Sequence, residues 1–141
     1  MNELPRKRLS LIKIGSKAEL SDVLKLVFGL SNPEINVLFF LMNSERCQCI
    51  KSLKDHFEKN RTTIQRNLNK LLKFRLIQRS KKTYKEFMEL CREHNMVEYK
   101  PEYERGYLYV YKSIPTTDLK NRLSSAVESS FNEITQIIEQ F

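Results

Sequence analysis

The segment from Lys51 to Lys73, KSLKDHFEKNRTTIQRNLNKLLK, constrains the fold of this chain more than any other stretch. Four aliphatic residues in its second half have the i, i+4, i+7 and i+8 spacing of a helix with one apolar face: Ile64, Leu68, Leu71 and Leu72. Asn60 stands just before this helix as an N-cap, and the preceding residues form a shorter helix with Leu53 and Phe57 on one side. The segment therefore predicts two helices joined by a tight turn, which is a helix-turn-helix.

The opposite face of the predicted second helix is polar and carries no acidic residue. Such a helix can lie in the major groove of DNA, with its N-terminal polar side chains against the base edges. We expect base contacts from Thr62, Thr63, Gln65 and Arg66, with Arg66 best placed to read a guanine. We expect contacts with the phosphate backbone from Asn60, Arg61, Asn69, Lys70 and Lys73.

The charge of the chain is concentrated around this helix. Residues 51–85 hold twelve Lys or Arg against two acidic residues, a net charge of +10, whereas the whole chain carries +8. The remaining residues are therefore slightly acidic in sum. A basic amphipathic helix is often only a solvated surface, but neutralising phosphates and releasing their counterions is the physical use of so local an excess.

A β pattern follows the predicted second helix. LIQRS indicates a strand from Leu76 to about Ser80, and GYLYVYKSI alternates tyrosines with Leu108 and Val110 at the period of two of a half-buried strand. Two strands after such a helix make a winged helix-turn-helix. The basic residues expected on or near the wing, where they would meet the phosphate backbone or a minor groove of DNA, are Arg79, Lys81, Lys82 and Arg105.

The connection between these two strands is long. It contains 25 residues between Ser80 and Gly106, whereas a simple hairpin needs only about two to five. Residues 84–94 within it have the apolar spacing of a helix, and the insertion is rich in glutamate. It could cover core surface, build a subunit contact or form an effector site, and we place covering the core first.

Two helices are expected before the helix-turn-helix. The first is capped by Ser16, runs through Phe28 and stops at Gly29. The start of the second is marked by Ser31 and Glu34 at capping-box spacing, with Pro33 in the first turn. Residues 1–15 are basic, and either form a poorly ordered terminus or an arm that contacts DNA.

The C-terminal segment predicts one long amphipathic helix. Its apolar residues recur at close to 3.5 residues, and 25 helical residues span about 37 Å. This helix could pack along the first helix of its own chain, but the apolar stripe is longer than a small winged-helix body would cover. We therefore expect a homodimer that pairs this helix with its copy. The residues expected in that contact are Leu119, Leu123, Val127, Phe131, Ile134 and Ile138.

These elements predict a mainly α fold with a small β wing, of the α+β class. The expected domains are a DNA-binding winged helix-turn-helix over residues 1–115, with a basic arm at 1–15 and an extended wing at 76–113, and a dimerisation helix over 116–141. No apolar run approaches the roughly 20 residues that span a bilayer, and no secretory signal is recognisable. We expect a cytoplasmic protein that makes no membrane contact.

The cysteines suggest a rival site. Cys47, Cys49, Cys91 and His94 are ligands of the type that zinc prefers, although the Cys-x-Cys spacing is tighter than usual in structural zinc sites. Buried free cysteines are the expectation, with a metal cluster or a redox-sensing thiol pair as alternatives. No catalytic motif or phosphate-binding loop is present, so we expect neither an enzyme nor a cofactor.

Parts of the sequence resemble a known family. GLSNPEINVLFFL, NRTTIQRNLNKLLKFRLIQR, RGYLYVYKSIP and the amphipathic C-terminal helix together resemble the small archaeal-type winged-helix transcription regulators related to the TrmB-like family. The resemblance covers the chain from about Leu20 onward and implies a homodimeric DNA-binding protein, with Arg61 to Lys70 in the reading helix and Arg105 and Gly106 near the wing. The 25-residue insertion departs from the simplest members. The sugar-binding domain of larger TrmB-like proteins has no counterpart here, so their effector binding is not carried over.

The function predicted from these observations is a sequence-specific transcription regulator that binds double-stranded DNA as a homodimer. Two alternatives stay open: an architectural, chromatin-type DNA-binding protein, and a winged-helix adapter that binds proteins in a transcription assembly. The polar face of residues 61–73 favours DNA, because a protein adapter does not need a basic helix face without acids.

Overall fold

The structure, a computed structural model, describes residues 17–93 and 106–141. The chain divides into two compact units, residues 36–113 and the pair of segments 1–35 and 114–141. Each unit is described by itself below. The expected division into domains at residues 115 and 116 stays a prediction.

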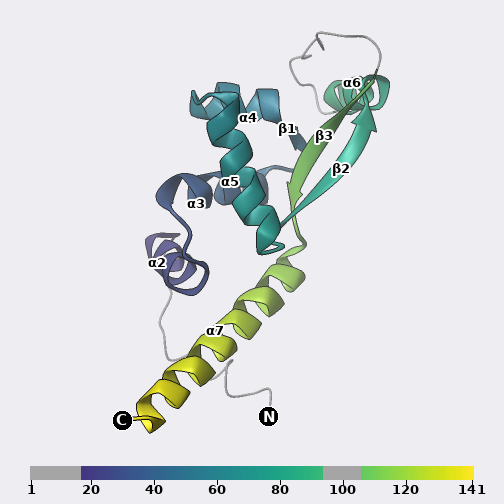
Figure 1. Ribbon diagram of the computed structural model, residues 1–141. Helices are drawn as coiled ribbons and strands as arrows, with labels where there is room; N and C mark the ends of the chain where they lie inside the picture. The colour runs from purple at the N-terminus through teal and green to yellow at the C-terminus, as the bar shows by residue number, and fades with distance from the viewer. Residues whose placement is uncertain (1–16, 94–105) are drawn as a thin grey trace. The chain divides into compact units, whose positions relative to one another are not determined.

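The unit of residues 36–113 is a winged helix-turn-helix (Figure 1). Its elements are the greater part of α3 (Asn32–Asn43), then β1 (Gln48–Cys49), α4 (Ile50–Phe57), α5 (Arg61–Lys73), β2 (Ile77–Thr83), α6 (Tyr84–Glu93) and β3 (Tyr107–Ser113). The strands form one antiparallel sheet in the order β1-β3-β2. The predicted fold class, mainly α with a small β wing, is confirmed.

Local hydrogen bonds define the helix-turn-helix. Asn60 adopts extended backbone angles and its Oδ1 accepts the backbone N–H of Thr63 at 2.8 Å, so the predicted N-cap of α5 is confirmed. Glu58 ends α4 in the left-handed region with φ of 53°, where its N–H donates to the carbonyl of Lys54. This left-handed residue reverses the chain between the two helices within a few positions.

The apolar face of α5 packs into the core of this unit. Ile64, Leu68 and Leu71 are fully buried, as their spacing predicts, while Leu72 is half-buried. Buried side chains from the neighbouring elements belong to the same core: Val37, Leu38, Leu41, Leu53, Leu76 and Tyr111. Burying this face fixes which side of α5 meets solvent.

The strands differ in extent from the sequence-based prediction. The short strand β1 is Gln48–Cys49, and α4 begins directly after it at Ile50. The strand predicted from Leu76 to about Ser80 is β2, Ile77–Thr83, which pairs with β3 over its whole length, from Ile77 opposite Ser113 to Thr83 opposite Tyr107. Pairing across the insertion lengthens the strand beyond what its own residues indicate.

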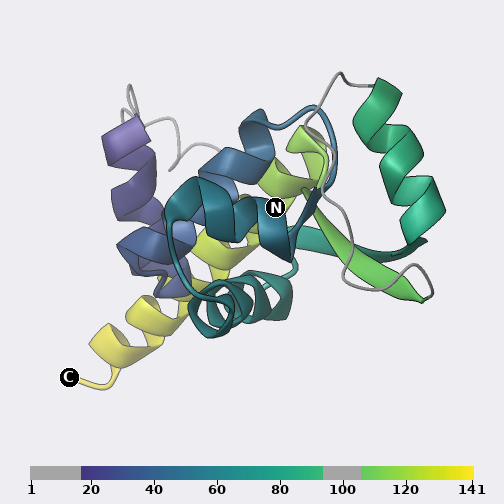
Figure 2. The same ribbon diagram turned by 90° about the horizontal axis from the view of Figure 1, so that it is seen from above.

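The inserted helix α6 begins directly after β2. It lies beside the outer end of the ribbon formed by β2 and β3 (Figure 2). Phe87 of α6 is buried in a cluster with Cys49 and Val110, and Leu108 packs against that cluster. The helical part of the insertion therefore covers core surface, the first of the three roles expected for it.

The other unit contains α2 (Lys17–Phe28), the first turn of α3 and the long helix α7 (Thr116–Glu139). Gly29 follows α2 with φ of 65° and donates to the carbonyl of Lys25, so the expected stop of the first helix is confirmed. The backbone N–H and the hydroxyl of Ser31 both donate to Glu34 Oε1, each at 2.7 Å. The bond from the Ser31 backbone N–H is one of the two bonds of the predicted capping box.

Among residues 17–93 and 106–141, no single helix has the length and apolar character to cross a membrane. The helices α2 and α3 pass that test only when taken together as a bent pair.

Candidate nucleic-acid interface

The exposed face of α5 brings the predicted DNA contacts together. Arg61, Thr62, Arg66, Asn69 and Lys73 are exposed, as is the cap residue Asn60, while Thr63, Gln65 and Lys70 are half-buried. The nine candidates therefore lie on one helix and its N-cap. No acidic residue stands between Lys59 and Lys73, so this face presents only positive and neutral groups.

Two hydrogen bonds already engage members of this face. The cap bond uses the Oδ1 of Asn60 and the backbone N–H of Thr63. Gln65 Nε2 donates to Asn69 Oδ1 at 3.0 Å, one helical turn further on. The amides of Gln65 and Asn69 thus hold each other in place, and each keeps further donors or acceptors for a ligand.

Asn67 is a polar residue of α5 that faces the other way. It is buried beside Ile64, Leu68 and Leu71 and belongs to the core side of the helix. Its position three residues after Ile64 and four before Leu71 is the signal that separates it from the exposed asparagine at position 69. It is therefore not a contact candidate.

The antiparallel register of β2 and β3 sorts the wing residues between two faces. Arg79, Lys81, Tyr107 and Tyr109 occupy one face, because residues on one strand alternate sides and opposed residues share a side. Lys82 pairs with Leu108 on the other face, which α6 covers through Phe87. Arg79, Lys81 and Lys82, which the sequence analysis grouped on the wing, therefore do not form a single surface. The fourth wing residue, Arg105, lies outside the described residues.

The environment of Lys82 is the start of α6. Thr83 and Glu86 form a capping box there: the Thr83 hydroxyl donates to Glu86 Oε1 at 2.9 Å, and the Glu86 backbone N–H donates to Thr83 Oγ1 at 3.2 Å. The hydrogen bond from the Thr83 hydroxyl, then that from the Thr83 backbone N–H, lowers the pKa of Glu86, and the nearby charge of Lys82 adds to this. The positive charge of Lys82 therefore interacts with the carboxylate of Glu86 in its own chain.

The tyrosines of β3 are the residues that the sequence analysis did not recognise as functional. It used them only as a strand pattern, whereas the structure places a cation over each exposed ring. Lys81 Nζ lies 3.5 Å from the ring centroid of Tyr107, and the Arg79 guanidinium carbon lies 4.6 Å from that of Tyr109. The alternation of basic and aromatic residues on two strands was the available signal, but recognising it requires the strand register.

The cysteines near β1 have a structural role. Cys49 is buried in the cluster with Phe87 and Val110, and Cys47 packs against that cluster. Cys49 Sγ accepts the backbone N–H of Ser52 at 3.4 Å, while the Cys49 backbone N–H donates to Ser52 Oγ at 3.1 Å. This capping box starts α4 and so helps to position the helix-turn-helix.

No group of three metal ligands occurs within residues 17–93 and 106–141. The zinc alternative involved Cys47, Cys49, Cys91 and His94. The side chain of Cys91 and the whole of His94 lie outside the described part of the chain. The Sγ of Cys49 accepts a hydrogen bond in the N-terminal cap of α4.

The long helix α7 carries apolar residues along its whole length. Leu119, Leu123, Val127 and Phe131 are half-buried, and α2 packs on α7 within their unit. Beyond them, Ile134 and Ile137 are each 55% exposed and Ile138 is 65% exposed. The structure thus shows the contact between α7 and α2 and, further along α7, an apolar surface that the described residues leave more than half exposed.

Comparison with known proteins finds solved structures with a similar fold. No family model matches the chain, and no curated protein sequence matches it. A solved structure described as a possible transcriptional regulator from Methanosarcina mazei Go1 is similar with a TM-score of 0.66 and 21% identity, over 87% of this chain and 88% of that one.

A second solved structure, of a protein from the thermoacidophilic archaeon Sulfolobus tokodaii, is similar with a TM-score of 0.59 and 16% identity. The alignment covers 84% of this chain and 97% of that one. At these identities the likeness concerns the fold. The chain therefore has a winged-helix fold that it shares, over most of its length, with a protein described as a possible transcriptional regulator.

Proposed function

We propose that this protein is a sequence-specific transcription regulator that binds double-stranded DNA as a homodimer. The observation that carries the proposal is the exposed, acid-free face of α5, which stands opposite a fully buried apolar face in a winged helix-turn-helix. The shared fold with a possible transcriptional regulator supports a regulatory role. The relationship to the TrmB-like family and a cytoplasmic, non-enzymatic role are parts of the same proposal.

In this proposal α5 enters the major groove. Thr62, Thr63, Gln65 and Arg66 contact base edges, and Arg66 donates two parallel hydrogen bonds to a guanine. The phosphate backbone is held by Asn60, Arg61, Asn69, Lys70 and Lys73. The role of Asn60 is then twofold, because its side chain also caps the helix.

The homodimer forms through α7. Burial of Ile134 and Ile138 against a second copy would remove exposed apolar surface from water, at about 25 cal/mol per Å². A two-fold pair of α5 helices could then read two half-sites of one operator. The half-buried residues Leu119, Leu123, Val127 and Phe131 would continue the same stripe.

The experiment that tests the proposal is a binding titration across salt concentrations. The purified protein is titrated with the DNA upstream of its own coding sequence and with an unrelated duplex of equal length. We expect at least tenfold tighter binding to the upstream DNA, because base contacts persist while phosphate contacts weaken with salt. Lys25→Ala removes one exposed charge from α2, outside the proposed DNA contacts, and serves as the control for a general loss of positive charge.

The two alternatives give different results in the same titration. Equal and steeply salt-dependent binding to both duplexes would replace the regulator with an architectural DNA-binding protein. The absence of binding to either duplex would favour the protein adapter.

A further inference from the structure

We propose that Arg79, Lys81, Tyr107 and Tyr109 form one contact surface for the sugar-phosphate backbone of duplex DNA, in which the two tyrosine rings hold the two cations in position. We call these four residues the wing ladder. The inference rests on the proposed function and assigns to Tyr107 and Tyr109 a positioning role that follows only from the strand register.

The geometry of the ladder is diagonal across the two strands. Lys81 is opposite Tyr109 but lies over Tyr107, and Arg79 is opposite Tyr111 but lies over Tyr109. The rings of Tyr107 and Tyr109 contact each other edge to face, with centroids 5.8 Å apart. The four side chains therefore touch in one continuous series.

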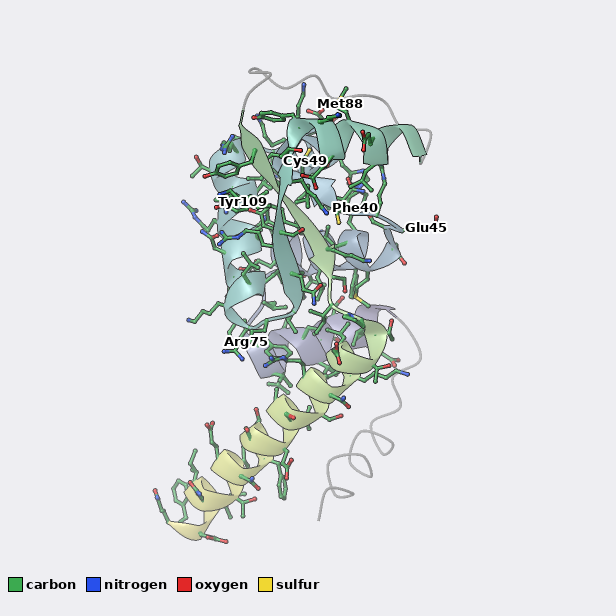
Figure 3. The ribbon with its side chains drawn as sticks, turned by 90° about the vertical axis from the view of Figure 1, so that its right-hand side faces the viewer. Phe40, Glu45, Cys49, Arg75, Met88 and Tyr109 are labelled. Atoms are coloured by element: carbon green, nitrogen blue, oxygen red, sulfur yellow. The ribbon has the colours of Figure 1, made fainter. Side chains whose placement is uncertain are left out.

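The ladder lies on an accessible face. Tyr107 is 51% exposed and Tyr109 is 38% exposed, and both cations are exposed. Figure 3 shows Tyr109 on the side of the ribbon away from Met88 and α6. Tyr111, on the same face, is buried and anchors the base of β3 in the core.

A cation that lies over an aromatic ring is restrained in position but keeps hydrogen-bond donors for another ligand. The ring face attracts the charge, yet an ammonium has three N–H donors and a guanidinium five, so donors remain for phosphate oxygens. A free lysine or arginine side chain loses rotamer freedom when it binds, whereas one already held against a ring loses less. The tyrosines thus lower the entropic cost of the phosphate contacts.

The chemistry of the face fits a row of phosphates. None of the residues of β2 and β3 on this face is acidic. Arg79 and Lys81 are two residues apart, or roughly 7 Å along the strand, and each strand of DNA carries one charge per roughly 3.4 Å of axis. The two cations can therefore contact separate phosphates of one DNA strand.

Lys82 provides a matched control, because it is adjacent in sequence but points to the face that α6 covers. We expect Lys81→Ala to reduce the slope of log affinity against log salt by about 0.9, the effect of one phosphate contact. Lys82→Ala should leave the slope unchanged. Equal losses in the two variants would overturn the assignment of the ladder face.

The positioning role is tested by two double variants that keep both cations. Tyr107→Phe with Tyr109→Phe retains the ring faces, whereas Tyr107→Leu with Tyr109→Leu removes them at similar bulk. We expect the Leu pair to bind upstream DNA roughly fivefold or more weakly than wild type and the Phe pair to bind nearly as wild type. Equal affinities of the Leu and Phe pairs would overturn the role of the rings, provided that circular dichroism shows both folded.

A measurement without DNA separates failure of the ladder from failure of the proposed function. In the free protein, the side-chain methylene protons of Lys81 should be shifted upfield by the ring of Tyr107, and Tyr107→Leu should abolish that shift. Absence of the shift in wild type would overturn the ladder itself. If the shift is present but wild type binds no duplex, the proposed function fails and the phosphate assignment fails with it.

Discussion

Arg61 and Arg66 are two exposed arginines on the same helix, with different expected partners. Arg61 is the first residue of α5, next to the cap, and Arg66 lies more than one turn further along. An arginine that reads a base contributes to sequence preference, whereas an arginine on a phosphate contributes equally to all sequences. The pair therefore permits a comparison in which the residue type, helix and charge change are the same.

Arg66→Ala should weaken binding to the preferred site by about 1–3 kcal/mol and flatten the preference between sites. Arg61→Ala should weaken binding to all duplexes alike and reduce the salt slope by about one. Both are measured by titration of preferred and scrambled duplexes. If the two substitutions had the same effect on preference, the assignment of base contacts on α5 would be incorrect.

Glu86 allows a test of the capping box at the start of α6. Its folded-state pKa is lowered from 4.5, first by the Thr83 hydroxyl, so ionised Glu86 favours the folded state. The stabilisation is present above the ordinary pKa of 4.5 and is lost as pH falls through the lowered folded-state value. We expect Thr83→Val to raise the pKa of Glu86 toward 4.5 in an NMR titration. An unchanged pKa would contradict the role of the hydroxyl.

At the scale of elements, α5 and α7 use their amphipathic character differently. The apolar face of α5 is fully buried within its own unit, which leaves the polar face for a ligand. The helix α7 has no fully buried residue and exposes isoleucines toward its C-terminal end. Exposed aliphatic residues at this density on one helix are typical of a surface that packs against another helix.

Ile138→Glu should convert a dimer into monomers of 16.8 kDa, because a buried charge without a partner opposes helix pairing. Gln136→Glu adds the same charge on the same part of α7 at an exposed polar position and should leave the dimer intact. Light scattering gives the mass of each variant. Removal of residues 117–141 should likewise yield monomers. If the Ile138→Glu variant or the truncated protein remained a dimer, the interface would lie elsewhere.

The whole molecule combines a locally basic reading unit with an otherwise slightly acidic chain. Residues 51–85 carry a net charge of +10, whereas the whole chain carries +8, so the remaining residues are slightly acidic in sum. Electrostatic attraction to DNA would therefore act on the helix-turn-helix and the first wing strand rather than on the surface as a whole. Such a distribution orients the protein as it approaches DNA. Together with the proposed two-fold dimer, it predicts a symmetric operator.

The two half-sites of that operator should be separated by whole helical turns, about 10–10.5 base pairs centre to centre or a multiple of that spacing. Inserting five base pairs between them should weaken binding strongly, because the second half-site then faces the opposite side of the duplex. Inserting ten should restore part of the affinity. Footprinting and titration of these operators check the expectation, and indifference to the insertions would contradict paired reading by a rigid dimer.

The positions of the helices, the caps at Asn60 and Ser31, and the exposed face of α5 could be predicted from the sequence alone. These features depend on residues within a few positions of each other: Asn60 with Thr63, Ser31 with Glu34, and the spacing from Ile64 to Leu71. Local hydrogen bonds and helical periodicity act over that distance, so a linear pattern is sufficient to predict them. The long C-terminal helix is predictable for the same reason.

The wing residues that share a face could be identified only from the observed strand pairing. The 25 residues between Ser80 and Gly106 leave the pairing of β2 with β3 open, and a shift of one residue would move every side chain of a strand to the other face. The pairing that occurs, with burial of Tyr111 and Val110 on opposite sides, places Lys81 over Tyr107 and turns Lys82 toward α6. The wing ladder follows from these long-range contacts, because burial selects the register and the register selects which side chains become partners.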